Sequence, residues 1–293
     1  MKDTFIVIFL RLLSWLSLSQ ARVLGRLLGG LATILNTRMT ATTRTNIWLC
    51  YPALSAQEQN LLVKHSMQHT FQTITEAGAV WLWPLQKVLN TIVVVEGETI
   101  LSQAFAAGKG VLVIAPHLGN WEVFGLYLNA CGIAQSHQMY QPPGSAVLGA
   151  LISKARSRAG ANMVPTDRAG VAELLKALKR GEIVGVLPDQ VPPRESGEYA
   201  TFFGKQVLTM SLITRLQQKT GAVVVSGYAR RSPGGFEVRF REVNPKVYAQ
   251  PMREALRGLN LTIEALVNEA PEQYQWDYKR FRRLADNEIS PYQ

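Results

Sequence analysis

His117 and Glu122 are two residues whose types and spacing could perform acid–base chemistry, and they lie in the segment HLGNWE at 117–122. A histidine takes up a proton near neutral pH. A carboxylate on its second ring nitrogen fixes the tautomer and stabilises the imidazolium. The segment holds no serine or cysteine, so the hydroxyl that His117 deprotonates would belong to a substrate. The alternative is a histidine at a helix cap beside a solvated glutamate, because short motifs recur by chance.

The elements around this pair predict where it lies in the fold. Residues 111–115 form a short apolar run with the length and β-branched content of a buried strand. Pro116 ends the run, residues 118–120 predict a turn, and Asn120 is a candidate N-cap for a helix that begins at Trp121. The pair would therefore lie at the carboxyl end of a strand, where open α/β sheets place their sites.

Strand-like and helix-like segments alternate from residue 91 onwards. Strands are expected at residues 91–95, 111–115, 137–140, 162–164, 183–187, 222–228 and 236–241. Helices are expected at residues 100–107, 121–130, 145–159, 171–180, 210–220 and 253–269. The pattern predicts an α/β fold with a mostly parallel mixed sheet covered by helices on both faces. SPGG at 232–235 predicts a hairpin between the last two strands, and FFGK at 202–205 is expected in a loop.

Two apolar segments, residues 5–19 and 23–35, precede this domain and are interrupted by Arg11, Arg22 and Arg26. The first is shorter than the ~20 apolar residues that span a bilayer comfortably, and no A-x-A-like cleavage site follows it. Arginines within apolar runs are typical of helices that lie in a membrane interface. We therefore expect a membrane-associating helical region at 1–40 and a single α/β domain at 41–293, rather than an ordinary buried helix pair at the N-terminus.

Two further signals concern helices. Gly25 and Gly29 have the small-xxx-small spacing that lets helices approach closely. Residues 55–58, SAQE, form a capping box that predicts a helix towards residue 81. This helix would carry His65 and His69, whose spacing of four suits a metal, but a polar helix face is the better interpretation because no third ligand is evident.

Composition favours a globular protein with an anionic partner. Of the 293 residues, 47% are hydrophobic and 18% charged, which excludes a disordered chain. The net charge of +10, from 31 Lys and Arg against 21 Asp and Glu, favours nucleic acid, an acidic protein or anionic lipid. Cys50 and Cys131 give neither metal spacing nor a disulfide framework, which indicates a reducing compartment.

Other polar residues are candidates for the same site. Arg156 and Arg158 end the helix at 145–159 and could hold a phosphate or carboxylate, or could simply favour the helix end. Asp189 follows the strand at 183–187, so it is either a site residue or a turn residue. Near the C-terminus, basic and aromatic residues alternate in a way that suits nucleic acid or an anionic membrane. The basic members are Lys279, Arg280, Arg282 and Arg283.

Four segments together resemble the bacterial lipid A late acyltransferases, the lauroyl/myristoyl transferases within the lysophospholipid acyltransferase superfamily. They are HLGNWE at 117–122, RSRAG at 156–160, LKALKRGEIVGVLPDQ at 175–190 and APEQYQWDYKRF at 270–281. The resemblance implies that His117 and Glu122 are the catalytic His-x4-Asp/Glu pair. It implies a functional arginine at Arg158, with Arg156 as the nearby alternative, and a functional aspartate at Asp189.

The resemblance also implies a reaction. A fatty acyl chain would pass from an acyl-carrier-protein thioester to a hydroxyl of a lipid A precursor, at the cytoplasmic face of the inner membrane, without a metal or nucleotide cofactor and without nucleic acid as a partner. Glu122 would orient His117, Arg158 would hold an acceptor phosphate or the oxyanion, and Asp189 would support the arginine or the site's hydrogen bonds. The alternatives are an acyltransferase for another lipid, such as a lysophospholipid or other glycolipid, and a non-catalytic membrane or nucleic-acid binding protein.

Overall fold

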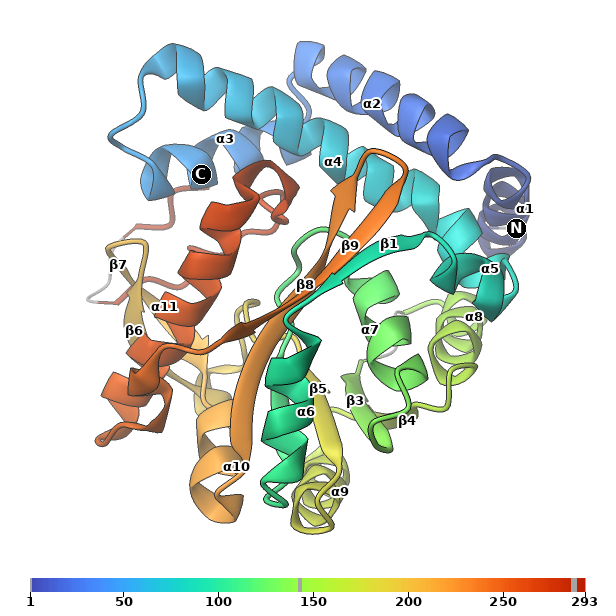
Figure 1. The fold of residues 1–293 in the computed structure, drawn as a ribbon. Helices are drawn as coiled ribbons and strands as arrows, with labels where there is room; N and C mark the ends of the chain where they lie inside the picture. Colours follow the sequence, from blue (N-terminus) through green and yellow to red (C-terminus); the bar gives the residue numbers. More distant parts are fainter. Residues whose placement is uncertain (1, 142–143, 286–288, 293) are drawn as a thin grey trace.

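The structure is a computed structural model that describes residues 2–141, 144–285 and 289–292 (Figure 1). Its centre is a seven-stranded mixed sheet with helices on both faces, which confirms the predicted fold class. The strands are β1 (Ile92–Glu96), β2 (Val111–Ile114), β3 (Ser136–Tyr140), β4 (Asn162–Pro165), β5 (Ile183–Val186), β8 (Val223–Ser232) and β9 (Gly235–Glu242). Each of these strands was expected from the sequence, and β8 runs further than expected, to Ser232.

The order of strands in the sheet is β1-β9-β8-β2-β5-β3-β4. All neighbours are parallel except β8 and β9, which form the predicted antiparallel hairpin. β2 lies at the centre, and its side chains alternate between two cores. Val111 and Val113 belong to one core, and Leu112 and Ile114 belong to the other. Burial on both faces explains why this strand is an uninterrupted apolar run in the sequence.

The helices that cover the sheet are also close to their expected positions. They are α6 (Glu98–Ala106), α7 (Trp121–Ala130), α8 (Ala146–Ser157), α9 (Arg168–Lys179), α10 (Leu212–Thr220) and α11 (Met252–Glu269). Side chains of α6 and α7 fill the core with Val111, and those of α9, α10 and α11 fill the core with Leu112. In the part of the chain that the structure describes, short 3₁₀ helices complete the connections: η1 (Arg194–Ser196), η2 (Pro245–Tyr248) and η3 (Pro271–Gln273).

A separate antiparallel hairpin, β6 (Gly197–Phe202) and β7 (Lys205–Met210), was not predicted. The expected loop at 202–205 is its turn, where Phe203 and Gly204 have positive φ angles of 45° and 77°. The sequence lacks the Asn-Gly or Asp-Gly pair that marks most two-residue hairpin turns, and for that reason the strands on either side were overlooked.

The N-terminal helices form a layer of their own: α1 (Lys2–Ser14), α2 (Leu18–Ile34), α3 (Arg38–Cys50), α4 (Ala56–Leu82) and the short α5 (Leu85–Leu89). The first apolar segment is not one helix, because α1 ends at Ser14 and Ser17 begins α2 through a capping box with Gln20. Within the described residues, no helix has both the length and the apolar character needed to cross a bilayer.

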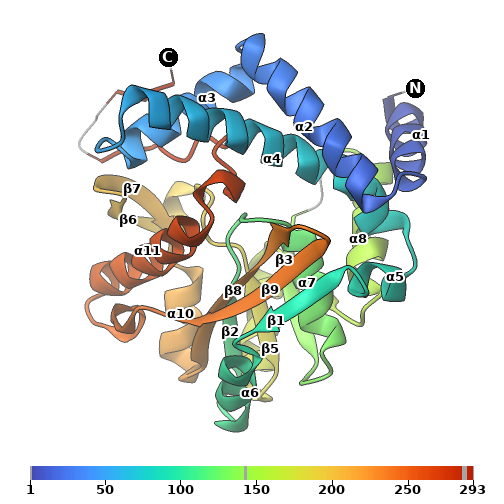
Figure 2. The same ribbon diagram turned by 45° about the horizontal axis from the view of Figure 1, so that its top comes forward.

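The close approach predicted from Gly25 and Gly29 is between α2 and α4. A Cβ atom on either glycine would lie 2.6 Å from a backbone Cα of α4, that of Gln72 or of Gln68. Figures 1 and 2 show α2 and α4 side by side above the end of the sheet at which β2 finishes. α4 begins at the predicted capping box of Ser55 and Glu58. The N-terminal layer therefore lies over the carboxyl ends of the parallel strands.

Candidate active site

The turn after β2 is fixed by backbone contacts to β8 and to the C-terminal segment. Gly119 has a φ of +62°, and a Cβ there would lie 2.0 Å from the carbonyl oxygen of Ala229, so only glycine fits. The Gly119 and Gln275 amides donate to the carbonyls of Gln273 and His117, each at 3.0 Å. Asn120 accepts a hydrogen bond from the Val123 amide at 3.2 Å and is the N-cap of α7, as predicted.

His117 is paired with Asp189. Its Nδ1 lies 2.8 Å from Oδ1 of Asp189, and its backbone amide donates to Oδ2 of the same carboxylate at 2.9 Å. The sheet explains this pairing, because β2 and β5 are parallel neighbours with Ile114 opposite Val186. Three residues beyond each of these positions are His117 and Asp189, at the same edge of the sheet.

The electrostatics of this pair define a tautomer. Burial acts to raise the pKa of the Asp189 carboxyl, but the charge and hydrogen bonds of His117 hold that pKa below its usual value. The ionised carboxylate is an acceptor only, so Nδ1 of His117 carries a proton, and in the neutral imidazole it is Nε2 that keeps the lone pair. The Trp121 ring lies against the imidazole edge-on, with 5.0 Å between the ring centroids. His117 is therefore held as a base with Nε2 available.

Glu122 is not the carboxylate that contacts His117. It accepts two hydrogen bonds from Arg156, from Nε at 2.9 Å and from Nη2 at 2.5 Å. Burial acts to lower the pKa of Arg156, and the charge of Glu122 raises it above its usual value. The expectation that Glu122 orients His117 through a hydrogen bond was wrong, because Asp189 occupies that place and Glu122 is held by Arg156.

Arg158 lies at the end of α4 rather than beside His117. Its guanidinium donates to the carbonyls of Trp81 at 3.1 Å, Trp83 at 2.7 Å and Val80 at 2.5 Å. These carbonyls belong to the last turn of α4 and its end, where helices leave acceptors without partners. Burial lowers the pKa of Arg158. In this structure the Arg158 guanidinium completes a helix terminus, and it is Arg156 that pairs with Glu122.

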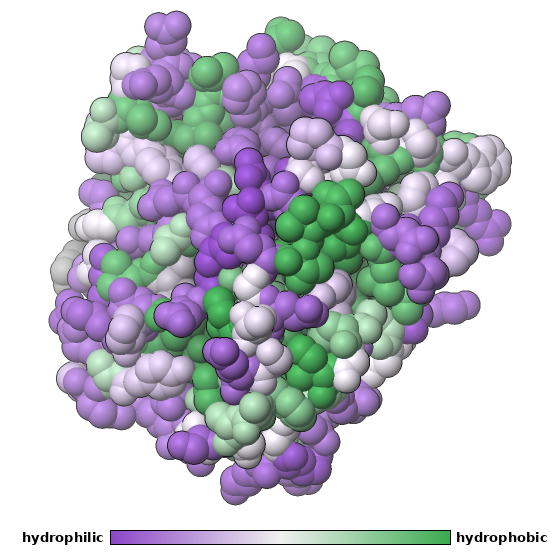
Figure 3. All heavy atoms as spheres, in the orientation of Figure 1, coloured by the Kyte–Doolittle hydropathy of each residue, from purple (hydrophilic) through white to green (hydrophobic). Residues whose placement is uncertain are grey.

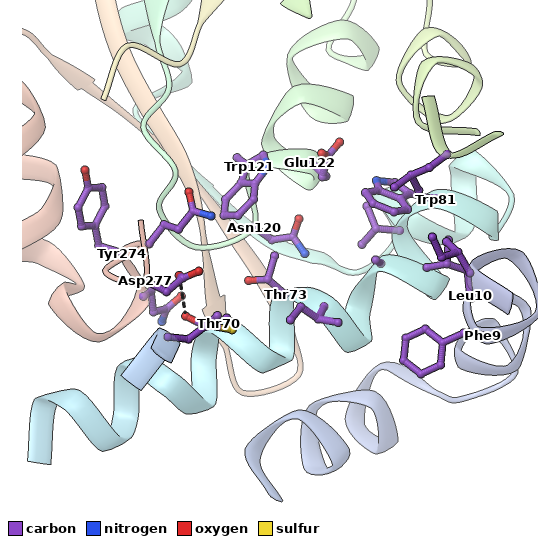
Figure 4. Close-up of a pocket in the computed structure, with 18 residues that line it drawn as sticks. Phe9, Leu10, Thr70, Thr73, Trp81, Asn120, Trp121, Glu122, Tyr274 and Asp277 are labelled. Carbon is purple, nitrogen blue, oxygen red and sulfur yellow. Dashed lines mark hydrogen bonds between the residues drawn. The ribbon is translucent and has the colours of Figure 1, made fainter. Parts of the chain in front are cut away.

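A pocket of about 400 Å³ lies between α1, α4, the start of α7 and residues 273–277. Figure 4 shows Phe9, Leu10 and Trp81 at one end of the pocket and Thr70 and Asp277 at the other. The Thr70 hydroxyl donates to Asp277 at 3.3 Å, and burial raises the pKa of that carboxyl. The pocket thus has an apolar end and a polar end.

The pocket reaches the surroundings of His117. Trp121 and Gln275, which both line it, also contact His117, through the ring packing and the backbone hydrogen bond given above. The side chain of Gln190 contacts both His117 and Gln275. Its Nε2 lies 3.4 Å from Nε2 of His117 and 3.2 Å from Oε1 of Gln275. Sequence reasoning missed Gln190 and Gln275, although both lie in segments that carried the resemblance.

The C-terminal basic cluster is only partly a surface feature. Arg280 is 3% exposed, donates to the Leu208 carbonyl at 2.8 Å and lies over the Phe202 ring. Lys279 and Arg282 are exposed. The expectation that Arg280 forms part of an exposed charged patch was therefore wrong, because the guanidinium fills a polar position in the core.

A second buried charge lies on the opposite side of the same turn. Glu76 of α4 is fully buried and accepts hydrogen bonds from Arg22 and Arg231 at 2.8 Å each and from the Asn120 amide at 2.9 Å. The contacts join α2, α4, β8 and the turn that carries His117. Nothing in the sequence marked Glu76, which reads there as one residue of a polar helix face.

Comparison with known proteins gives a consistent family. A sequence model described as bacterial lipid A biosynthesis acyltransferase matches residues 2–283. The chain is 28% identical over 272 residues to the lipid A biosynthesis palmitoleoyltransferase of Escherichia coli (strain K12), covering 92% of this chain and 87% of that protein. It is 28% identical over 277 residues to the lauroyltransferase of the same organism, with the same shares covered. The similarity to its myristoyltransferase is 24% over 254 residues, 84% of this chain and 76% of that protein.

Proposed function

The chain belongs to the bacterial lipid A biosynthesis acyltransferase family and is an acyltransferase, and we propose that it transfers a fatty acyl chain from an acyl-carrier-protein thioester to a hydroxyl of a lipid A precursor. One observation carries this proposal. His117 is held by Asp189 with its Nε2 free, and its neighbours line a pocket with an apolar and a polar end. This arrangement suits deprotonation of a hydroxyl on an amphiphilic substrate.

The proposed reaction uses the contacts described above. Nε2 of His117 takes the proton of the acceptor hydroxyl, and the oxygen attacks the thioester carbonyl. When the tetrahedral intermediate collapses, the carbon–sulfur bond breaks and the thiolate takes the proton from the imidazolium. Asp189 orients the ring and stabilises its charged form. We assign the site arginine to Arg156, which Glu122 fixes in place, and we propose that its remaining N–H groups face an anionic group of the substrate.

The acceptor class is supported by the two ends of the pocket. Phe9, Leu10 and Trp81 offer apolar surface for a hydrocarbon chain, and Thr70 and Asp277 offer hydrogen-bonding groups for a headgroup. A lipid that carries sugar hydroxyls matches this division. A lysophospholipid would match it less well, since it has a smaller headgroup with fewer hydroxyl groups for this polar end.

Membrane association is supported by a second observation, the exposed apolar faces of α1 and α2. These faces consist of Phe5, Ile8, Leu12, Val23, Leu27, Leu31 and Ile34, each at least 46% exposed. Their spacing of three or four residues places them along one stripe of each helix, and Figure 3 shows apolar surface where α2 lies at the top of the view. Stripes of this kind are typical of helices that lie in a membrane interface.

The same helices connect the membrane to the pocket. Ile6, Phe9 and Leu10 of α1 line it, so a lipid acceptor could enter from the bilayer along α1. The net charge of +10 favours both an anionic leaflet and an acidic carrier protein. We therefore place the enzyme at the cytoplasmic face of the inner membrane.

The reaction can be tested directly with the full chain in vesicles that contain anionic lipid. Acyl-carrier-protein thioester is supplied as the donor, and a lipid A precursor or a lysophospholipid as the acceptor, with products analysed by mass spectrometry. We expect the mass of one acyl chain to be added to the lipid A precursor only, and His117→Ala to abolish the gain. Acylation of the lysophospholipid alone would replace the proposed acceptor.

Membrane association can be tested separately by vesicle flotation. We expect Leu27→Glu combined with Leu31→Glu to reduce binding to anionic vesicles, because both side chains are exposed on α2. Leu61→Glu is the matched control, since Leu61 is similarly exposed at 51% but lies on α4. Equal flotation of both variants and the parent would locate the membrane contact elsewhere.

A further inference from the structure

Gln190 occupies a position at the reacting nitrogen of the site. Its amide nitrogen is 3.4 Å from Nε2 of His117, and 3.2 Å from Oε1 of Gln275, which accepts one of its two N–H groups. When the imidazole is neutral with its proton on Nδ1, Nε2 of His117 has a lone pair, and the second N–H of Gln190 forms a long, weak hydrogen bond to it. Among the described residues, no other side chain forms a hydrogen bond to this nitrogen.

Acyl transfer requires more than a base. Attack on a thioester moves the carbonyl π electrons onto oxygen, and a donor that meets this oxyanion is commonly the largest single contribution to catalysis. The donor must be near the hydroxyl that His117 activates, because attacking oxygen and oxyanion are bonded to the same carbon. Gln190 is at that place.

Several other donors of the surrounding residues are already engaged, wholly or in part. The Asn120 amide donates to the buried carboxylate of Glu76, and Nε and Nη2 of Arg156 donate to Glu122. The guanidinium of Arg158 is engaged with three carbonyls of residues 80–83. Gln190 differs from these donors, because its contact to His117 is long and is lost as soon as a substrate hydroxyl occupies Nε2.

We propose that Gln190 is a further catalytic residue whose side-chain amide donates to the oxyanion of the tetrahedral intermediate, an assignment that rests on the acyl transfer proposed above. When the acceptor hydroxyl binds to Nε2 of His117, it displaces the Gln190 N–H towards the thioester carbonyl. The new carbon–oxygen bond forms as the hydroxyl proton passes to His117, and the carbonyl electron pair becomes the oxyanion that Gln190 meets. Gln275 keeps the amide oriented throughout.

The test uses Gln190→Met, which keeps the length of the side chain and removes both N–H groups. We expect kcat to fall by about 10²–10³, the cost of one lost oxyanion donor, with little change in KM. Gln190→Glu should lower kcat further, because a carboxylate repels the oxyanion. Gln275→Met should cause a smaller loss, since it removes only the acceptor that orients the amide. Thermal melting of each variant provides the check on folding.

A structural role is separated from an oxyanion role by inhibitor binding. The probes are a phosphonate, in which tetrahedral phosphorus with an anionic oxygen replaces the reacting carbon, and the matched ether, which lacks that oxygen. Gln190→Met should weaken binding of the phosphonate by the same factor as it lowers kcat/KM, and should leave binding of the ether unchanged. Unchanged phosphonate binding in Gln190→Met would overturn the assignment. A parent enzyme that neither acylates the lipid nor prefers the phosphonate would instead overturn the proposed function.

Discussion

Two charged clusters contact the same turn of the chain and differ in how completely their hydrogen-bond acceptors are filled. The His117 cluster consists of His117, Asp189 and Gln190, and the Glu76 cluster of Glu76, Arg22, Arg231 and Asn120. In the Glu76 cluster, one carboxylate oxygen accepts from Arg22 and the other from Arg231 and Asn120. In the His117 cluster, Nε2 of His117 has only the 3.4 Å contact to Gln190. The unfilled acceptor next to a pocket indicates chemistry, and the filled carboxylate indicates a structural role.

The two histidines beside these clusters differ in the same way. His117 has a carboxylate partner, Asp189, 2.8 Å from its Nδ1. His69 lies on α4 near Arg231 and Arg22, and its Nδ1 is buried with no hydrogen-bond partner among the described residues. Burial and the neighbouring arginines lower the pKa of His69 to about 3. His69 therefore stays neutral near pH 7 and has no carboxylate partner in the described part of the chain, whereas His117 is paired with Asp189.

The largest effect is expected from breaking the His117 cluster. His117→Ala removes the base and should lower kcat by roughly 10²–10⁴, and Asp189→Asn should be nearly as damaging, because an amide in place of the carboxylate favours the wrong tautomer. Steady-state kinetics measure this, and melting temperatures should show both variants folded. If Glu122→Gln instead lowered kcat more than Asp189→Asn does, Glu122 and not Asp189 would be the residue that orients His117.

Breaking the Glu76 cluster should affect stability instead of chemistry. Glu76→Ala leaves two buried guanidinium groups without a counter-charge, and we expect a loss of about 3–5 kcal/mol in the free energy of unfolding. Urea denaturation measures this loss. Glu58→Ala on the same helix is the matched control, since Glu58 is exposed and should have a much smaller effect. A Glu76→Ala protein with parental stability and reduced kcat would contradict the comparison.

The same contrast explains what the sequence could and could not predict. The strands and helices were found because burial on both faces of β2 and β5 leaves uninterrupted apolar runs between helical periods. The partner of His117 was not predicted from the sequence, because the choice between Asp189 and Glu122 depends on which strands are neighbours in the sheet. Only the order of the sheet places β5 beside β2 and brings Asp189 to the end of the same edge.

The two arginines of RSRAG show the same limit at the level of one helix. Residues two apart on an α-helix lie about 200° apart around its axis, so Arg156 and Arg158 must face different surroundings. The sequence does not say which face of α8 meets α4 and which meets Glu122. Glu76 was missed for a related reason, since its partners Arg22 and Arg231 are far from it along the chain.

Conservative substitution of these two arginines should sharpen the comparison. Arg156→Lys cannot keep both hydrogen bonds to Glu122, and we expect kcat/KM to fall about 10- to 100-fold at little cost in stability. Arg158→Lys should lose part of its contacts to the end of α4, on the order of 1–3 kcal/mol in stability, with kcat retained. Steady-state kinetics and urea denaturation of both variants measure these effects. A fall in kcat confined to Arg158→Lys would mean that Arg158, and not Arg156, is the site arginine.

The last effect concerns pH and His69, and it is small within any one pH unit. Its pKa of about 3 in the folded protein lies below the ordinary value of 6.5, so between these values the unfolded chain binds a proton that the folded chain excludes. Its contribution to stability is therefore complete above pH 6.5 and is lost as pH falls towards 3, by on the order of 1 kcal/mol per pH unit.

His69→Gln removes this titration, and the difference in unfolding free energy between parent and variant should shrink as pH falls from 6.5 to 4, or reverse in favour of the variant. Urea denaturation at a series of pH values measures it. His65→Gln, an exposed position one turn earlier on α4, is the matched control and should follow the parent. Parallel pH curves for the parent and His69→Gln would mean that His69 accepts a proton in the folded state after all. Burial and the arginines of the Glu76 cluster would then not keep His69 neutral, and the contrast with His117 would lose its electrostatic basis.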